Sequence, residues 1–220
     1  MSESDASAMT RGVFLSFEGG EGSGKSLQAK LLTEALAKRG RDVVLTREPG
    51  GTAAGERIRE IVLHAQEIAL SPEAQVLLYS TARAQNVREV IRPALDAGKI
   101  VIADRFFDST RAYQGYGHGV PQAAIQVVTD LAVGDTVPDR TFLLDIPTDI
   151  GLGRSGWKAR AKWDRFEVLD TDFHERVREG YLRMAAAEPR RWAVINADRD
   201  ERSIAADVLR EIDALLGAPA

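Results

Sequence analysis

Residues 19–26 read GGEGSGKS and match the phosphate-loop pattern G-x-x-x-x-G-K-[ST] in full. The apolar segment VFLSFE at 13–18 comes before this loop, and LQAKLLTEALAKR at 27–39, which has the composition of a helix, comes after it. Glycines let the loop backbone curve around phosphate oxygens with its N–H groups pointing inward, and the N-terminus of the next helix adds a positive end. The segment therefore predicts a strand–loop–helix unit that binds a nucleoside triphosphate.

The last two residues of this loop have defined chemistry. The ammonium group of Lys25 would neutralise the β- and γ-phosphates, and the hydroxyl of Ser26 would ligate Mg²⁺. The loop alone does not identify the reaction, because GTPases, motors and transporters carry the same pattern. No Asn-Lys-x-Asp segment, which is typical of guanine recognition, is found in the sequence.

The rest of the chain predicts an α/β fold around this unit. Short, nearly continuous apolar segments are typical of strands that are covered on both faces, and segments of helical period separate them. Such an alternation favours a five-stranded parallel sheet with helices on both faces, in which ligands bind at the carboxyl ends of the strands. The expected strands are 13–18, 43–46, 100–104, 141–145 and 192–196, and the expected helices are 25–39, 71–97, 121–131, 173–188 and 202–216.

Composition limits the class of protein. The chain has 220 residues, no cysteine and a net charge of −4, with 44% hydrophobic residues. These values fit a cytoplasmic protein without disulfides or cysteine-bound metals, and the mild acidity disfavours nucleic acid as a partner. No apolar run reaches the roughly 20 residues of a membrane span, so no membrane contact is expected. We expect a disordered tail at 1–11 and a single domain at 12–220.

A second phosphate site is predicted at the end of the third strand, where Asp104-Arg105-Phe106 follows an apolar run. Asp104 could hold Mg²⁺ or its waters, and Arg105 could grip a second phosphate through two hydrogen bonds. Arg47 ends the second strand, within TREPGGT at 46–52, and should reach the same edge. An acceptor phosphate is already ionised at neutral pH, so arginines and a metal are expected here rather than a general base.

Two residues of the long helix suit a flat heterocycle. Tyr79 and Arg83 are four residues apart and therefore lie on one helix face. A ring could stack on the tyrosine while the guanidinium reads a carbonyl edge, although a tyrosine that packs on an arginine stem is also common.

The basic segment RSGWKARAKWD at 154–164 predicts a mobile lid that extends over about 151–164. Arg154, Lys158, Arg160 and Lys162 could close over the phosphates and supply positive charge in the transition state. Without the phosphate loop, the same segment would be interpreted as a solvated helix end.

Together these motifs resemble the thymidylate kinase family in its bacterial form. The phosphate loop, TREPGGT, the Tyr79–Arg83 pair, Asp104-Arg105-Phe106 and Tyr113-Gln114-Gly115 follow one another in the family's order and spacing. The resemblance extends from about residue 13 to 216. It implies phosphoryl transfer from ATP to dTMP with Mg²⁺, for dTTP synthesis, by a homodimer with a five-stranded parallel sheet and a P-loop kinase fold.

The resemblance also implies roles for individual residues. The expected catalytic residues are Lys25, Arg105, Arg47 and Arg160. ATP would be bound by Gly19, Gly20, Glu21, Gly22, Ser23, Gly24, Lys25, Ser26, Arg154 and Asn196. The acceptor dTMP would be bound by Glu21, Arg47, Tyr79, Arg83, Arg105, Thr110, Tyr113 and Gln114, and the metal by Ser26 and Asp104.

Three alternatives remain open from the sequence. A P-loop kinase of another small monophosphate would keep the two phosphate sites and differ in the base pocket. A GTPase switch would need tighter binding of GTP than of ATP. A non-catalytic relative would bind nucleotides without transferring phosphate, and the unusual lid favours this alternative.

Overall fold

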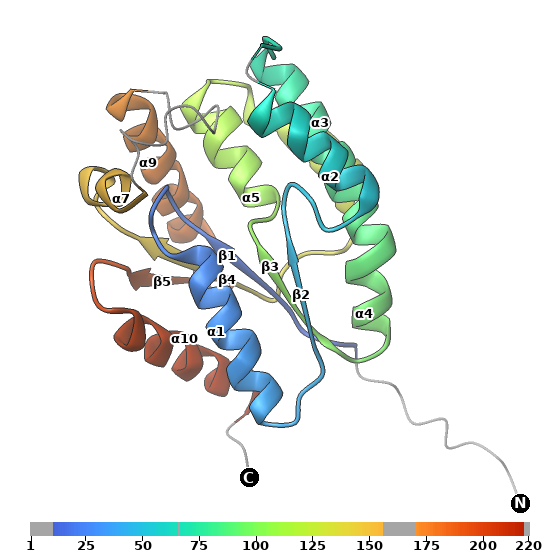
Figure 1. Ribbon diagram of the computed structural model, residues 1–220, viewed down its shortest axis with the longest axis vertical. Coiled ribbons are helices and arrows are strands. Elements are labelled where there is room, and N and C mark those ends of the chain that lie inside the picture. Colours follow the sequence, from blue (N-terminus) through green and yellow to red (C-terminus); the bar gives the residue numbers. More distant parts are fainter. Residues whose placement is uncertain (1–10, 66, 156–169, 218–220) are drawn as a thin grey trace, which may run out of the picture.

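The computed structural model describes residues 11–65, 67–155 and 170–217 (Figure 1). Its centre is one parallel sheet with the strand order β2-β3-β1-β4-β5. The predicted five-stranded sheet is therefore confirmed, and each strand lies within one residue of its expected bounds. The strands are β1 (Phe14–Glu18), β2 (Val43–Arg47), β3 (Ile100–Asp104), β4 (Arg140–Asp145) and β5 (Trp192–Asn196).

Helices cover both faces of the sheet, as predicted, and alternate strand residues point to opposite faces. Leu15 packs with Leu36 and Ile212 on the face covered by α1 and α10, whereas Phe14 packs with Ile91 on the other face. The helical segments, in which η marks a π-helical one, are α1 (Lys25–Lys38), α2 (Ala53–Arg59), η1 (Glu60–His64), α3 (Pro72–Asn86), η2 (Val87–Ile91), α4 (Arg92–Asp96), α5 (Phe107–Thr110), η3 (Arg111–Gly117), α6 (Gln122–Val133), α7 (Thr148–Ser155), α9 (Thr171–Ala187) and α10 (Glu201–Leu216).

The helix expected at 71–97 is present, but it changes geometry in its middle. It begins after Ser71, whose hydroxyl accepts a hydrogen bond from Ala74 N, and it widens to the π-helical η2 just before Pro93. Proline has no N–H to donate and its ring crowds the preceding turn, so a change of helical geometry at this point has a local cause.

Two helical stretches were neither among the expected helices nor part of the predicted lid. α2 and η1 follow the Pro-Gly-Gly turn, and Thr52 begins them by accepting a hydrogen bond from Gly55 N at 3.0 Å. The segment from α5 to η3 follows β3 directly. The first stretch follows turn residues and the second has mixed polarity. Neither therefore shows the hydrophobic period by which helices are predicted.

The register of the strands brings their carboxyl ends to one edge of the sheet. Phe17 of β1 and Arg47 of β2 are both opposite Asp104 of β3, and Asp145 of β4 is opposite Asn196 of β5. Parallel sheets of this kind bind ligands outside this edge. The phosphate loop leaves β1 at the same edge, so the functional residues are sought there.

Three predictions concern the ends, the lid and the membrane. The predicted tail falls outside the described residues except for Arg11, which pairs with Asp139 at 3.4 Å. Of the predicted lid, residues 151–155 belong to α7 and the remainder, with Arg160, lies outside the described residues. Among the helices that the structure describes, none is long and apolar enough to cross a membrane.

Candidate active site

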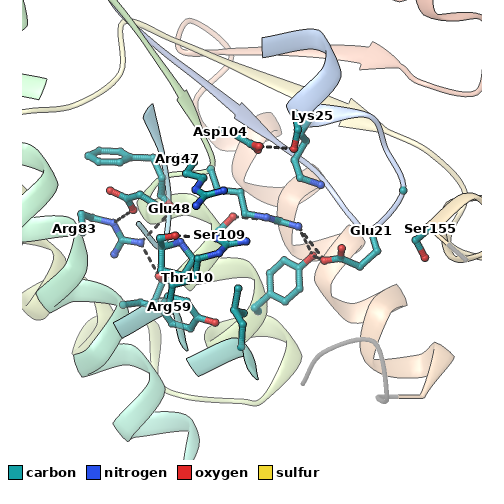
Figure 2. Close-up of a pocket in the computed structure, with 18 of the residues that line it drawn as sticks. Glu21, Lys25, Arg47, Glu48, Arg59, Arg83, Asp104, Ser109, Thr110 and Ser155 are labelled. Atoms are coloured by element: carbon teal, nitrogen blue, oxygen red, sulfur yellow. Dashed lines mark hydrogen bonds and ion pairs between the residues drawn. The ribbon is translucent and has the colours of Figure 1, made fainter. Parts of the chain in front are cut away.

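A cavity of about 500 Å³ opens at the carboxyl ends of β1, β2 and β3. The structure brings eleven of the predicted functional side chains into its wall, from five separate parts of the chain (Figure 2). These residues are Glu21, Lys25, Ser26, Arg47, Tyr79, Arg83, Asp104, Arg105, Thr110, Tyr113 and Gln114.

The phosphate loop is shaped by two glycines with left-handed backbone geometry. Gly24 has φ 89° immediately before α1, and Gly22 has φ 67°. A Cβ atom on Gly22 would lie 1.9 Å from the carbonyl oxygen of Gly151 in α7. A side chain at this position would therefore push the loop away from α7, so the close packing of loop and helix requires glycine.

Lys25 is folded back into the loop. Its Nζ donates to the carbonyl oxygen of Gly20 at 2.7 Å and to the hydroxyl of Ser23 at 3.2 Å. Burial and the nearby Arg105 lower the pKa of Lys25 to about 8, although carboxylates such as Glu21 oppose the shift. The nearby carboxylates only partly offset the effect of burial on the ammonium group of Lys25. A phosphate bound in the loop would add the negative charge that stabilises the ammonium form.

Ser26 and Asp104 form the candidate metal site. The hydroxyl of Ser26 donates to Asp104 Oδ2 at 2.5 Å, which places two oxygen ligands side by side. These donors fit Mg²⁺, which takes oxygen ligands and commonly uses only one or two from the protein. Within the described ranges, no group of three or more His, Cys, Asp or Glu side chains could hold a metal, so phosphates and water would complete the coordination.

Arg105 lies at the centre of the cavity wall beside a carboxylate. Its Nη2 donates to Glu21 Oε1 at 2.9 Å and to the hydroxyl of Tyr113 at 3.3 Å, and this hydroxyl donates to the same Glu21 oxygen at 2.7 Å. Burial alone would raise the pKa of Glu21, but Arg105 and Lys25 outweigh it and lower the pKa to about 2. At neutral pH this corner of the cavity therefore holds an ionised carboxylate beside two cations.

A second carboxylate supports Arg105 from beneath. Glu18 is fully buried at the end of β1 and accepts hydrogen bonds from Phe106 N at 2.8 Å, Ser109 Oγ at 2.6 Å and the hydroxyl of Tyr181 at 2.9 Å. The hydroxyl of Ser109 also accepts a hydrogen bond from Arg105 Nη1 at 3.2 Å. Burial raises the pKa of Glu18 to about 7. The backbone that carries Arg105 is thus tied to β1 through Glu18.

Arg83 is buried and held in one orientation. Its Nε donates to Glu48 Oε2 at 2.7 Å and its Nη2 donates to Thr110 Oγ1 at 3.0 Å, on opposite sides of the guanidinium (Figure 2). Its Nη1 is also buried, yet it has no hydrogen-bond partner among the residues that the structure describes. A buried N–H without an acceptor is costly. Arg83 lines the cavity beside Tyr79, so a ligand carbonyl is a suitable acceptor for this group.

Comparison with known proteins agrees with this geometry. The family model described as thymidylate kinase matches residues 17–208. A thymidylate kinase of Pelotomaculum thermopropionicum is 48% identical over 208 residues, which cover 94% of this chain and 96% of the relative. The chain belongs to the thymidylate kinase family. The predicted resemblance is thereby confirmed.

Other relatives and a solved structure agree. A thymidylate kinase of Roseiflexus sp. (strain RS-1) is 47% identical over 206 residues, which cover 89% of this chain and 91% of the relative. The crystal structure of a thymidylate kinase from Ehrlichia chaffeensis has a TM-score of 0.75 and 34% identity, and the match covers 92% of this chain and 99% of that one. The likeness to thymidylate kinases therefore extends over nearly the whole length of the chain.

In this member of the thymidylate kinase family, Arg47 is more exposed than Lys25, Arg83 and Arg105. Its side chain is 54% exposed and pairs with Glu56 of α2 at 2.9 Å, and Glu56 also accepts a hydrogen bond from Gly51 N at 3.1 Å. Arg47 and Arg105 both line the cavity, but the side chain of Arg105 is only 19% exposed. A role on the acceptor phosphate therefore requires Arg47 to exchange Glu56 for the ligand.

Arg154 and Asn196 lie together outside the cavity wall. Arg154 donates to the carbonyl oxygen of Ala197 at 2.8 Å and pairs with Asp198 at 2.9 Å, so it joins the end of α7 to the loop after β5. The side chain of Asn196 accepts a hydrogen bond from Asp198 N at 2.8 Å. This juxtaposition fits two walls of one nucleotide pocket, and the ATP-binding roles predicted for both residues stay predictions.

Several residues that complete the site were not predicted from the sequence. Glu48 stands inside TREPGGT, so a signal for it was present, whereas Ser109 lies in α5 just after Arg105 and no motif marks it. Glu18 ends an apolar strand, as Asp104 does, and could have been identified by this analogy. Gln75 precedes Tyr79 by one turn of α3, so a local signal was present, whereas Tyr181 reaches the site from a distant segment and no local pattern marks it.

Proposed function

We propose that this chain transfers the γ-phosphoryl group of ATP to dTMP and releases ADP and dTDP, in the cytoplasm and in the service of dTTP synthesis. Membership of the thymidylate kinase family supports the reaction. The observation that carries the choice of base is the buried, unpartnered Nη1 of Arg83 in the cavity wall, as far as the described residues go. The O4 carbonyl of thymine is an acceptor of the kind that this group requires.

The donor side consists of the phosphate loop and its helix. Backbone N–H groups of residues 19–24 and the N-terminus of α1 would cradle the phosphates of ATP, while Lys25 would reach the β- and γ-phosphates. Ser26 and Asp104 would hold Mg²⁺, which when bound neutralises charge that develops on the transferred group. The positions of Lys25 and Ser26 at the start of α1 support this assignment.

The acceptor side is built around Arg105. Its guanidinium would bind the phosphate of dTMP and hold it in line with the donor, and its fixed position beside Glu21 and above Ser109 supports this role. The phosphate acceptor is already ionised, so no side chain has to remove a proton. Tyr113, whose hydroxyl contacts Glu21, would lie against the deoxyribose and disfavour a 2′-hydroxyl.

The base side combines stacking with a polar edge. Tyr79 would stack on thymine, Arg83 would donate to O4, and Thr110 and Gln114 would line the remaining edge. The positions of all four residues in one cavity support the assignment. Thr110 already holds Arg83 through its hydroxyl, so its own contribution is to orient the arginine.

The reaction is tested by a panel of acceptors. Purified protein is mixed with ATP, Mg²⁺ and, separately, dTMP, dUMP, the ribose form of TMP, dCMP, dGMP and AMP, and ADP release is followed. We expect fast turnover with dTMP, slower turnover with dUMP and near-background values for the others. Fast turnover with a different monophosphate would overturn the base assignment. Binding of ATP and dTMP without turnover would identify a non-catalytic relative.

We further propose that the chain forms a homodimer through α3 and α6. The two helices pack side by side, and three large apolar side chains on them are strongly exposed: Leu77 at 57%, Val127 at 70% and Leu131 at 88%. Exposed apolar side chains that gather on one surface indicate an interface more often than scattered ones do.

Leu131→Glu is therefore expected to shift the protein from dimer to monomer, because a carboxylate in an apolar interface loses its hydration. Light scattering coupled to size-exclusion chromatography measures the mass directly. Val194→Glu changes an exposed apolar residue on β5, and it serves as the matched control that keeps the dimer. A dimer that withstands Leu131→Glu at micromolar concentration would contradict this choice of surface.

A further inference from the structure

Two buried glutamines form a chain of hydrogen bonds that ends at the proposed base site. Gln75 Nε2 donates to the carbonyl oxygen of Leu70 at 3.2 Å, and Gln114 Nε2 donates to Gln75 Oε1 at 3.1 Å. Gln75 is 4% exposed and Gln114 is 1% exposed. Gln114 lines the cavity, whereas Gln75 belongs to α3 and lies behind it.

The backbone carbonyl at the start of this chain of hydrogen bonds fixes its polarity. A carbonyl oxygen can only accept, so Gln75 has to turn its NH₂ group toward Leu70 and its own oxygen toward Gln114. That oxygen can only accept as well, so Gln114 has to turn its NH₂ group toward Gln75. The remaining polar atom of Gln114 is its carbonyl oxygen, to which no hydrogen bond from the described residues is found.

We propose that Gln75 is a specificity-determining positioning residue, which fixes the amide of Gln114 so that a carbonyl oxygen faces the base. This inference rests on the proposed function, because it concerns the base of the acceptor nucleotide. Thymine and uracil carry an N–H at ring position 3 and can donate to this oxygen. Cytosine carries an unprotonated nitrogen there, and two acceptors would face each other.

Arg83, the second residue proposed to contact the base, is also held by a buried neighbour. Glu48 holds Arg83, so that Nη1, for which no described residue is an acceptor, is a fixed donor in the same cavity. A donor on Arg83 beside an acceptor on Gln114 matches the O4 carbonyl of thymine and its neighbouring N–H at ring position 3. Cytosine presents an amino group and an unprotonated nitrogen at these positions, and neither can pair with the corresponding side chain. Sites that leave buried polar groups unpaired discriminate strongly against the wrong ligand.

A purely structural role for Gln75 predicts a different result. Gln75 also satisfies the Leu70 carbonyl just before α3, so its loss can lower the stability of that helix end. Lower stability reduces the affinity for every nucleotide alike. The ratio of the affinities for dTMP and dCMP changes only if Gln75 acts through the orientation of Gln114, and this ratio is therefore the informative readout.

The test uses two substitutions of similar size at Gln75. Gln75→Met removes both hydrogen bonds and frees the Gln114 amide to rotate, so the preference for dTMP over dCMP should fall about tenfold. Gln75→Glu keeps an oxygen that accepts from Gln114, and the preference should stay within about twofold of the wild type. Affinities are measured by calorimetric titration with each monophosphate, which requires no turnover.

A double-mutant cycle completes the test. In a Gln114→Met background there is no amide to orient, so Gln75→Met should no longer change the preference. An unchanged preference in Gln75→Met, an equal loss in Gln75→Glu, or the same loss in the Gln114→Met background would each overturn the inference. Failure of the proposed function is seen separately, as an absence of ADP release by the wild type with dTMP.

Discussion

Replacement of Arg105 by alanine is expected to lower kcat/KM for dTMP by about 10³-fold, in line with the loss of an arginine that stabilises phosphoryl transfer. The acceptor phosphate carries nearly two negative charges at neutral pH and has to approach the ionised Glu21. In the proposed complex Arg105 would lie between these charges, since its Nη2 donates to Glu21 Oε1 at 2.9 Å. Without it, the phosphate would lose its main cation and meet an uncompensated carboxylate.

The measurement is steady-state kinetics with dTMP, together with ATP binding and thermal unfolding. ATP affinity and the unfolding temperature should stay near the wild-type values, since Arg105 serves the acceptor. Arg105→Lys keeps the charge but cannot form the bidentate hydrogen bonds of a guanidinium, so an intermediate loss of kcat/KM is expected. Arg57→Ala removes an exposed arginine from α2 and is the control for a general change in charge. Activity within tenfold of the wild type in Arg105→Ala would refute the role.

The backbone at Arg105 offers a further control. Its φ is 69°, in the left-handed region that favours glycine, and within the described residues it is the one non-glycine residue with a positive φ. Arg105→Gly removes the same side chain as Arg105→Ala and relieves the backbone. We expect the glycine variant to be at least as stable as the alanine variant and equally inactive, which separates the side chain's function from its effect on folding.

The parts of the site that lie in one continuous segment could be predicted from the sequence. The phosphate loop between β1 and α1 carries its own glycines, lysine and hydroxyl, and its flanking apolar segments identify the sheet. Asp104 and Arg105 follow a buried strand, so the rule that ligands bind at strand ends was enough to place them. The spacing of Tyr79 and Arg83 was also a local signal, because helix geometry alone puts both on one face.

The contacts of the supporting residues could not be predicted, because they join distant segments. Glu18 and Tyr181 are 163 positions apart, and Gln75 and Gln114 are 39 apart. A position at a strand end or on a helix face can mark such a residue, but no local pattern shows which partner it contacts. Arg47 shows the reverse case, since its motif was clear but its pairing with Glu56 could be known only after α2 was placed. The lid, with Arg160, lies outside the described residues and stays a prediction.

Lys25→Ala is the second substitution for which a very large loss is expected, about 10³-fold in kcat, since it removes a preorganised donor to the transferred phosphate. Lys25 is 7% exposed, and among the described residues its Nζ has only loop atoms at hydrogen-bond distance, the carbonyl oxygen of Gly20 and the hydroxyl of Ser23. Lys38→Ala, at the exposed end of the same helix, is the matched control and should keep full activity. Steady-state ADP release reports both variants, and retention of more than a tenth of the wild-type kcat in Lys25→Ala would contradict the assignment.

The pKa of Lys25 gives this assignment a signature that loss of folding cannot imitate. Burial lowers the pKa of Lys25 to about 8 in the protein without ligands, and bound phosphates favour the charged ammonium, so its pKa rises in the complex. Between the two values, ATP binding takes up a proton, and the apparent Kd for ATP should increase about tenfold between pH 7.5 and pH 9. In Lys25→Arg the guanidinium stays charged throughout this range, so the increase should disappear. Titrations at both pH values, without acceptor, would show an equal increase in the two proteins if Lys25 were not the group that meets the phosphates.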